Sequence, residues 1–275
     1  MPELYKYSGA GNDFVVLDGR SEDVSGFRSA DKISKLCDRQ SGFRAADGRT
    51  GADGLMILSS SEEYDFRMEY FNSDGSGGMM CGNGGRCIVA FADFLGIRPA
   101  AGSVLVFEAA DGLHTGEVVS RDDDCKVVRL KMIDVHEYRP ALDGWFLNTG
   151  TRHFVRFVKD VEDIDIEVEG KAARWDPEFA PVGANANFVS ESEDGFLCVR
   201  TFEKGVEAET LACGTGITAC ALAAHICGIS PSRIGSGGRV EYRIHARRDD
   251  LSVDFIPSSN CFKDVYLTGP ADLVR

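Results

Sequence analysis

The chain has 275 residues, of which 43% are hydrophobic and 27% charged, and its formal net charge is −14. This length allows two domains of ordinary size or one large domain of a globular protein. The negative charge argues against nucleic acid and anionic membrane surfaces as partners. The nine cysteines form no C-x-x-C pattern, so we expect no metal site. The N-terminus carries no apolar signal core, so the reducing cytoplasm is the expected compartment.

Strands and glycine-rich turns are predicted for the first eighty residues. Residues 4–18 predict two strands joined by a turn, with Asn12 and Asp13 at the bend. The turn lacks the G-x-x-x-x-G-K-[ST] pattern and no helical pattern follows it, so a nucleotide-binding loop is not expected. A helix is expected at 29–39 and strands at 55–58 and 66–71, the last leading to Asn72 and a turn before Cys81.

A repeated apolar helix is the strongest pattern in the chain. Cys81-Gly-Asn-Gly84 and Cys213-Gly-Thr-Gly216 each open an almost unbroken run of small and apolar residues. A helix that is apolar on nearly all sides belongs in a core, and about fourteen residues are too few to cross a bilayer. At the same offset of 132 residues, Gly96 and Gly228 end the two runs, and a proline follows each. The sequence therefore predicts an internal duplication with one thiol at the same place in each copy.

The position of these two thiols has a chemical consequence. A thiol at a helix N-terminus lies at the positive end of the helix dipole, which favours the thiolate and lowers the thiol pKa. Glycines after the cysteine allow backbone N–H groups to approach an anionic ligand closely. The other cysteines are expected to be small core residues, the usual role of this residue type. Cys81 and Cys213 are therefore the candidate catalytic residues.

The predicted fold class is α+β, with two pseudo-symmetric domains that are each a mostly antiparallel curled sheet around a central buried helix. We expect one domain to comprise 1–116 plus 262–275 and to carry Cys81, and the other to comprise 117–261 and to carry Cys213. The acidic segment 160–170 is expected to be exposed. Further strands are expected at 104–110, 113–119, 126–132, 145–148, 153–158, 196–202, 240–246, 251–256 and 264–267.

Two thiols of this kind suit the inversion of a carbon centre by proton transfer. Such a reaction needs a base on one face of the carbon and an acid on the opposite face, which two equivalent groups from a duplicated fold can supply. General acid–base catalysis works best when the catalyst pKa lies near the working pH, as it does for a cysteine tuned by a helix dipole. Backbone N–H groups beside each thiol would stabilise the negative charge that develops when the α-proton leaves.

The motifs that carry these residues resemble those of the diaminopimelate epimerase family over nearly the whole chain. They include Gly9-Ala-Gly-Asn-Asp-Phe14, Met80-Cys-Gly-Asn-Gly84, Glu209-Thr-Leu-Ala-Cys-Gly-Thr-Gly216 and Leu267-Thr-Gly-Pro-Ala271. The resemblance implies an epimerase that interconverts LL- and meso-diaminopimelate without a cofactor, in the lysine and cell-wall pathway. It also implies a homodimer that acts on a small-molecule substrate and a site that closes over this substrate.

The resemblance also assigns roles to individual residues. Cys81 and Cys213 are the acid/base pair, and His153 and Glu203 tune their protonation. At two positions the chain departs from the family pattern: Thr151 stands in place of an asparagine and Lys204 in place of an arginine. These departures affect recognition of the distal end of the substrate, for which Arg152 is a substitute contact. The implied substrate-binding residues are Asn12, Asn72, Gly82, Asn83, Thr151, Asn185, Glu203, Lys204, Gly214 and Thr215.

Two alternatives remain open from the sequence. A related two-cysteine racemase or epimerase would act on another amino acid such as proline or hydroxyproline, although Asn83 after Cys-Gly, with Asn72 and Asn185, argues against the proline type. A catalytically silent ligand-binding protein would keep the fold but would need neither thiol.

Overall fold

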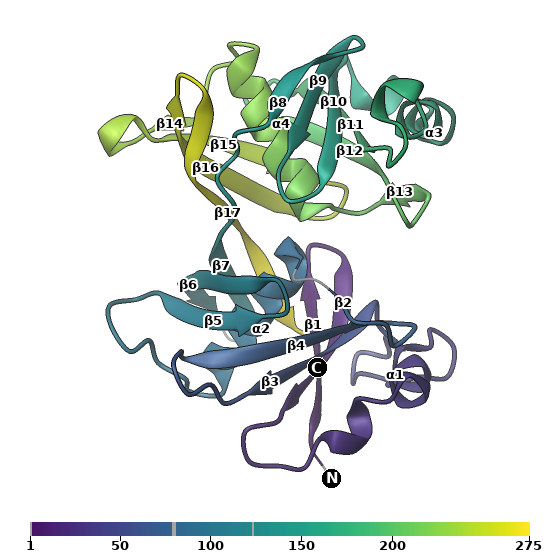
Figure 1. The fold of residues 1–275 in the computed structure, drawn as a ribbon, viewed down its shortest axis with the longest axis vertical. Helices are drawn as coiled ribbons and strands as arrows, with labels where there is room; N and C mark the ends of the chain where they lie inside the picture. The colour runs from purple at the N-terminus through teal and green to yellow at the C-terminus, as the bar shows by residue number, and fades with distance from the viewer. Residues whose placement is uncertain (1, 79–80, 123) are drawn as a thin grey trace. The chain divides into compact units, whose positions relative to one another are not determined.

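The computed structural model describes residues 2–78, 81–122 and 124–275, and Met80 of the first cysteine motif lies outside them. The chain divides into two compact units, which we call unit 1 (Met1–Leu130 with Gly269–Arg275) and unit 2 (Lys131–Thr268). The last strand, β17 (Cys261–Leu273), contributes its first residues to unit 2 and its last residues to unit 1 (Figure 1).

The strands of unit 1 close into a mixed barrel. Each strand pairs with the next in the order β1-β2-β3-β4-β5-β6-β7-β17, and β17 pairs back to β1. The β2–β3 and β4–β5 pairings are parallel and the others are antiparallel. Besides β17, these strands are β1 (Leu4–Gly9), β2 (Asn12–Asp18), β3 (Gly54–Ser59), β4 (Phe66–Asn72), β5 (Leu105–Ala109), β6 (Gly112–Asp122) and β7 (Cys125–Lys131).

Two helices cover the two faces of this barrel wall. Inside, α2 (Gly82–Phe94) contacts β1, β2, β3 and β6, and the Phe91 ring lies 5.2 Å from that of Tyr5 and 5.7 Å from that of Tyr7. Outside, α1 (Ala30–Cys37) packs on β3, and its Ile33 joins a core cluster with residues of β2 and β3. Because both faces of β2 and β3 are covered, these strands are nearly continuous apolar runs.

The strands of unit 2 also follow one another around a central helix. The order is β8-β9-β10-β11-β12-β15-β16-β17, with β10–β11 and β12–β15 parallel. Val135, just before β8, bridges Phe262 of β17, so the succession returns to its beginning. The strands are β8 (Tyr138–Ala141), β9 (Gly144–Asn148), β10 (Arg152–Phe157), β11 (Asn185–Glu191), β12 (Leu197–Glu203), β13 (Ala208–Thr210), β14 (Arg233–Ile234), β15 (Val240–His245) and β16 (Asp250–Ser258).

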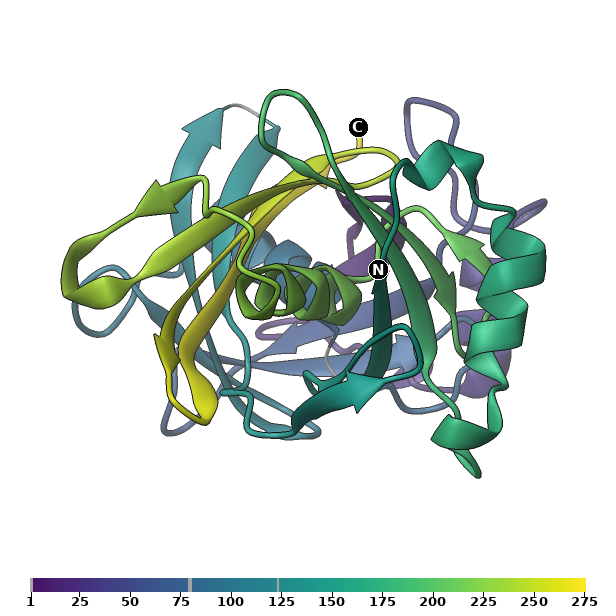
Figure 2. The same cartoon turned by 90° about the horizontal axis from the view of Figure 1, so that it is seen from above.

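The central helix of unit 2 is α4 (Gly214–Ile226), which contacts β9, β10, β11, β12, β15 and β16. Figure 2 shows α4 almost along its axis, surrounded by these strands. Short helices cover the outer face of the β10–β12 wall. One of their residues, Phe179, packs against Phe146 and Phe154. The short helices of the chain are η1 (Ser25–Phe27), η2 (Val161–Asp163), η3 (Ile166–Gly170), α3 (Lys171–Arg174), η4 (Pro177–Phe179) and η5 (Ser236–Gly238).

Two features differ from the sequence-based expectation. The units divide after Leu130 and before Gly269 rather than after 116 and before 262, because β6 continues past 116 and β7 completes the same barrel. The expectation of mostly antiparallel pairing is confirmed, with two parallel pairings in each unit. The acidic segment 160–170 is not wholly exposed, because Val161 and Ile166 belong to the core. Among the described residues, no helix is long and apolar enough to span a membrane.

Candidate active site

Cys81 occupies the N-cap of α2, the core helix of unit 1. Its backbone is extended (φ −110°, ψ 155°), and its sulfur accepts the backbone N–H of Gly84 at 3.3 Å. The first hydrogen bond between backbone groups at this end of the helix runs from Gly85 N to Cys81 O. The N–H of Gly82 lies ahead of this first bond in the chain, so this N–H has no acceptor within the helix. The sulfur therefore lies where backbone donors and the helix dipole both favour negative charge.

A chain of side-chain amides links this helix end to the β1–β2 turn. Asn83 donates from Nδ2 to Oδ1 of Asn12 at 2.7 Å, and Asn12 donates from Nδ2 to Oδ2 of Asp53 at 3.0 Å. The turn is tight because Ala10 (φ 54°) and Gly11 (φ 101°) are both left-handed. The structure thus brings together two of the expected binding residues, Asn12 and Asn83, and holds each by the other.

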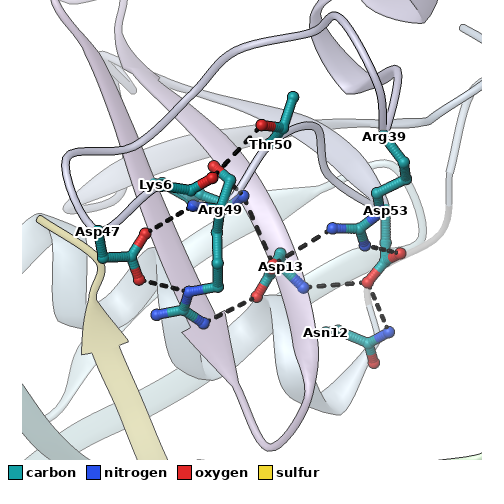
Figure 3. A network of polar contacts seen from close by, with 9 residues as sticks. Lys6, Asn12, Asp13, Arg39, Asp47, Arg49, Thr50 and Asp53 are labelled. Atoms are coloured by element: carbon teal, nitrogen blue, oxygen red, sulfur yellow. Dashed lines mark hydrogen bonds and ion pairs between the residues drawn. The ribbon is translucent and has the colours of Figure 1, made fainter.

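Charged residues behind Asn12 fix the position of Asp53 (Figure 3). The carboxylate of Asp53 accepts the backbone N–H of Asp13 at 3.0 Å and also pairs with Arg39. Arg39 and Lys6 approach Oδ2 of Asp13 at 3.3 and 3.5 Å. Burial lowers the pKa of Lys6, and the positive charge of Arg39 acts in the same direction, while Asp13 opposes them. This network anchors the loop that carries Asp53, and through it the Asn12 amide.

A fully buried arginine lies one turn into α2. Arg86 is 0% exposed, and its guanidinium donates to Gly82 O at 3.2 Å, Asn83 Oδ1 at 3.0 Å and Pro270 O at 3.2 Å. It therefore holds the Asn83 amide in one orientation, with Oδ1 toward the guanidinium and Nδ2 toward Asn12. It also places a positive charge close to the start of the helix.

Asn72 lies at the same barrel edge as the β1–β2 turn. The strand register places Phe14, Gly54 and Asn72 side by side on β2, β3 and β4. Asn72 donates from Nδ2 to Oγ of Ser76 at 3.0 Å, within the turn that follows β4. The expected residues of unit 1 therefore belong to the end of the barrel at which α2 begins.

Cys213 occupies the equivalent position on α4, the core helix of unit 2. Its backbone is extended (φ −115°, ψ 109°), and it is 9% exposed. Its sulfur lies 3.4 Å from Oγ1 of Thr215 and makes no side-chain cap bond to the helix backbone. The first backbone hydrogen bond at this end runs from Ile217 N to Cys213 O, so the N–H groups of Gly214 and Thr215 have no acceptor within the helix.

His153 lies directly behind Thr215. Its Nε2 is 3.0 Å from Oγ1 of Thr215 and 2.8 Å from Oγ1 of Thr151, and these two hydroxyls are 2.9 Å apart. On the other side of the ring, Nδ1 faces Nδ2 of Asn187 at 3.2 Å. Burial of the imidazole lowers the pKa of His153 to about 3. The ring is therefore neutral at physiological pH.

Asn185 ties the end of β12 to β10. Its Nδ2 donates to Arg152 O at 3.1 Å and its Oδ1 accepts the backbone N–H of Lys204 at 2.8 Å. Glu203 is the last residue of β12, the same strand-end position that Asn72 has on β4. The Arg152 guanidinium donates to Phe179 O at 3.2 Å and lies over the Phe146 ring, so it is held by the wall of unit 2.

The two helices also carry deeply buried thiols that contrast with the candidate pair. Cys87 on α2 and Cys220 on α4 are both 0% exposed, and burial raises the pKa of each thiol well above its usual range. These two cysteines are therefore inert core residues, as expected from the sequence. The same expectation is wrong for Cys125 and Cys227, which are exposed.

Sequence reasoning missed three residues that hold the expected ones in place: Asn187, Thr149 and Arg86. Asn187 lies two residues after Asn185, so the strand period alone places it on the same face. Thr149 donates from Oγ1 to Thr215 O at 2.9 Å, across 66 positions of the chain. Arg86 lies near the start of an otherwise largely apolar helix, and no local pattern indicates that its partners are carbonyls and an amide.

Comparisons with known proteins agree with the motifs. The sequence profile of a family described as "Diaminopimelate epimerase" matches residues 4–127 and 145–254. A relative named diaminopimelate epimerase from Flavobacterium psychrophilum is 38% identical over 272 residues, covering 99% of this chain and 98% of the relative. A relative of the same name from Chlorobaculum tepidum is 38% identical over 273 residues, covering 97% of each chain.

Solved structures with the same fold are more distant in sequence. A PhzF-family phenazine biosynthesis protein from Bacillus anthracis has a TM-score of 0.72 at 13% identity, covering 99% of this chain and 96% of that one. A probable proline racemase from Agrobacterium radiobacter K84 has a TM-score of 0.63 at 18% identity, covering 100% and 92%. At these identities the similarity establishes a shared fold alone.

Proposed function

Because the chain belongs to the diaminopimelate epimerase family, we propose that it interconverts LL-2,6-diaminopimelate and meso-diaminopimelate. The reaction inverts one α-carbon, needs no cofactor and serves lysine and peptidoglycan precursor biosynthesis. The observation that carries this proposal is the repeated placement of a cysteine at the N-cap of a core helix, Cys81 on α2 and Cys213 on α4.

The proposed mechanism uses one thiolate and one thiol. A thiolate sulfur removes the α-proton, the electron pair of the C–H bond passes into the carboxylate as an enediolate, and the other thiol delivers its proton to the opposite face. The roles of Cys81 and Cys213 exchange in the reverse direction. This mechanism requires one sulfur on each face of the reacting carbon.

The backbone beside each thiol suits the charge that develops. The N–H groups of Gly82 and Asn83 on α2, and of Gly214 and Thr215 on α4, belong to the first turn of their helices. Donors at a helix N-terminus favour an anion and cost no rearrangement during the reaction. We assign these four residues to the carboxylate on the reacting carbon.

The remaining expected residues receive narrower roles. Asn12, Asn72, Asn185, Glu203 and Lys204 are assigned to the polar groups of the substrate. His153 tunes Cys213 through its hydrogen bond to Thr215 rather than through charge, because its imidazole is neutral. Glu203 is the ionisable group assigned to the tuning of the thiols. Thr151 is engaged by His153 and Thr215, so its assignment to the substrate itself is the least supported.

The substrate assignment is tested by isotope exchange with alternative amino acids. The protein is incubated in heavy water with LL-diaminopimelate, L-proline or trans-4-hydroxy-L-proline, and deuterium at the α-carbon is followed by mass spectrometry. The proposal predicts deuterium in diaminopimelate alone. Exchange confined to proline or hydroxyproline would assign the protein to the related racemases, and no exchange in any of the three would indicate a binding protein.

Two broader assignments follow from the family and are proposed with it. The chain acts as a homodimer and works in the cytoplasm on a small-molecule substrate. Light scattering of the purified protein tests the first, with a mass of twice 29.8 kDa as the expected result.

A further inference from the structure

The surroundings of His153 determine which ring nitrogen carries the hydrogen. The key residue is Asn187, whose side-chain amide has both ends fixed. Its Oδ1 accepts the hydroxyl of Thr201 at 2.9 Å, and its Nδ2 donates to Phe154 O at 2.8 Å. A carbonyl can only accept, so the amide nitrogen must lie on the side of Phe154 and of the imidazole.

The second hydrogen of this amide nitrogen is directed at the imidazole, because its other acceptor, Asn185 O, is farther away at 3.4 Å. Nδ2 of Asn187 lies 3.2 Å from Nδ1 of His153, so Nδ1 must accept. A neutral imidazole that accepts at one nitrogen carries its hydrogen on the other. His153 is therefore in the Nε2–H form, and Nε2 can donate but cannot accept.

This tautomer limits how the two neighbouring hydroxyls can point. Nε2 of His153 and the oxygens of Thr151 and Thr215 form a triangle with edges of 2.8, 2.9 and 3.0 Å. Nε2–H donates to one of the two hydroxyl oxygens, and Nε2 cannot accept a hydrogen bond in return. Inside the triangle, a hydroxyl hydrogen can therefore form only the hydrogen bond between the two hydroxyls. One hydroxyl hydrogen must therefore point out of the triangle, and the sulfur of Cys213 lies 3.4 Å from Oγ1 of Thr215.

We propose that Asn187 and the hydroxyls of Thr151 and Thr215 are positioning groups that direct a hydrogen-bond donor onto the sulfur of Cys213. Each group donates a hydrogen bond to the next. Asn187 donates to His153, His153 donates to Thr151, Thr151 donates to Thr215, and Thr215 donates to the sulfur. The proposal rests on the proposed function, since it concerns the thiolate of Cys213. A donor aimed at the sulfur stabilises the thiolate over the thiol, and no proton is transferred along the series.

The same geometry changes the role of Thr151. Its hydroxyl accepts from His153 and donates to Thr215, so it belongs to the support of Cys213 rather than to the substrate. Thr149 adds to this support, because it holds the carbonyl of Thr215 from the strand end at 2.9 Å.

The first test uses the wild-type protein and needs no substrate. Nitrogen-15 NMR of the imidazoles at pH 7 distinguishes the two neutral tautomers. The proposal predicts the Nε2–H form for His153. A signal for the Nδ1–H form would overturn it.

The second test measures the reactivity of the thiol. The rates at which iodoacetamide modifies Cys213 and Cys81 are read from peptide masses of the same sample, so Cys81 serves as the internal control. Thr215→Val removes the hydroxyl but keeps the backbone N–H, and we expect Cys213 to react about tenfold more slowly while Cys81 is unchanged. Thr215→Ser should restore the rate, and Asn187→Leu should slow Cys213 in the same way.

The outcomes separate this inference from the proposed function. Unchanged modification of Cys213 in Thr215→Val, or equal slowing of both thiols, would overturn the positioning role. Because both tests are independent of turnover, a wild-type protein inactive on diaminopimelate would fail the proposed function by a different measurement.

Discussion

The sulfur of Cys81 accepts the backbone N–H of Gly84 at 3.3 Å, within the same helix turn. Cys213 has no such cap bond, and its sulfur lies 3.4 Å from the hydroxyl oxygen of Thr215 instead. The two helix ends thus offer one sulfur a backbone donor and the other a side-chain donor. A side-chain donor can be removed by substitution, so the two thiols can be perturbed separately.

Each of the two thiols should be necessary for turnover. Removing a positioned acid or base costs about 10²- to 10⁴-fold in rate, so Cys81→Ala and Cys213→Ala should each lower kcat on diaminopimelate by that factor. Cys227→Ala is the matched control, because this cysteine is exposed at the C-terminal end of α4. Full activity of either single variant would contradict the assignment.

Alanine substitutions at the paired glycines should differ in cost. A Cβ at Gly216 would lie 2.5 Å from Oδ1 of Asn187 and 3.2 Å from the His153 ring, whereas a Cβ at Gly84 would meet nothing closer than the Cys81 sulfur at 3.3 Å. Alanine otherwise favours a helix by about 1 kcal/mol. We expect Gly216→Ala to lower the free energy of unfolding by about 2 kcal/mol or more and Gly84→Ala by less than about 1 kcal/mol. Urea denaturation of the two variants measures both values, and equal costs would refute the close packing at Gly216.

The neutral state of His153 predicts a pH effect on stability. Its pKa is about 3 in the folded protein, because of burial, and near 6.5 in the unfolded chain. Between these values the unfolded state binds the extra proton, so stability falls as pH decreases through this window. At pH 5 the loss should reach about 2 kcal/mol relative to pH 7.

This effect is isolated by comparison with His153→Gln. The difference in stability between pH 7 and pH 5 should be smaller in the variant by about that amount. NMR titration of the wild-type imidazole provides a check that does not depend on the variant's folding. A ring that titrates between pH 5 and 8 would contradict the account.

The one acidic residue of α2 should matter for stability through its partly buried partner. The side chain of Asp93 is 8% exposed and pairs with Lys126 (12% exposed) at 3.1 Å, and with the more exposed Arg121 and Arg98. Asp93→Ala leaves the partly buried Lys126 charge without this carboxylate, at a cost of about 2–3 kcal/mol. Arg98→Ala removes only an exposed partner and should cost less than about 1 kcal/mol. Thermal or urea unfolding compares the two, and similar costs would contradict this ranking.

The sequence predicted the local features well because their causes are local. Both core helices begin at their cysteine and end just before a glycine, as the apolar runs and helix-ending signals indicate. The return of the last segment to the first domain was predicted as well, and β17 pairs there with β7 and β1. The strands with which it pairs could not be predicted, since these pairings join segments far apart in the chain. For the same reason the domain boundary was expected too early.

The candidate site shows the same contrast between local features, which the sequence indicates, and long-range contacts, which it does not. The cysteines and glycines at the helix starts were recognisable by motif, but the partners of His153 were not, because Asn187, Thr151 and Thr215 come from three separate elements. Lys126 likewise gave no sign that it would pair with Asp93. Such contacts are set by the strand register and by the position of each helix in its barrel.

The two-base mechanism is tested most directly by the position of the isotope during a single inversion. LL-diaminopimelate is converted in heavy water to low extent, and deuterium is measured at the α-carbons of the meso product and of the recovered LL substrate. Two thiols acting from opposite faces predict deuterium in the product and almost none in the recovered substrate. Equal deuterium in both would show that one group removes and returns the proton, and would contradict the paired roles of Cys81 and Cys213.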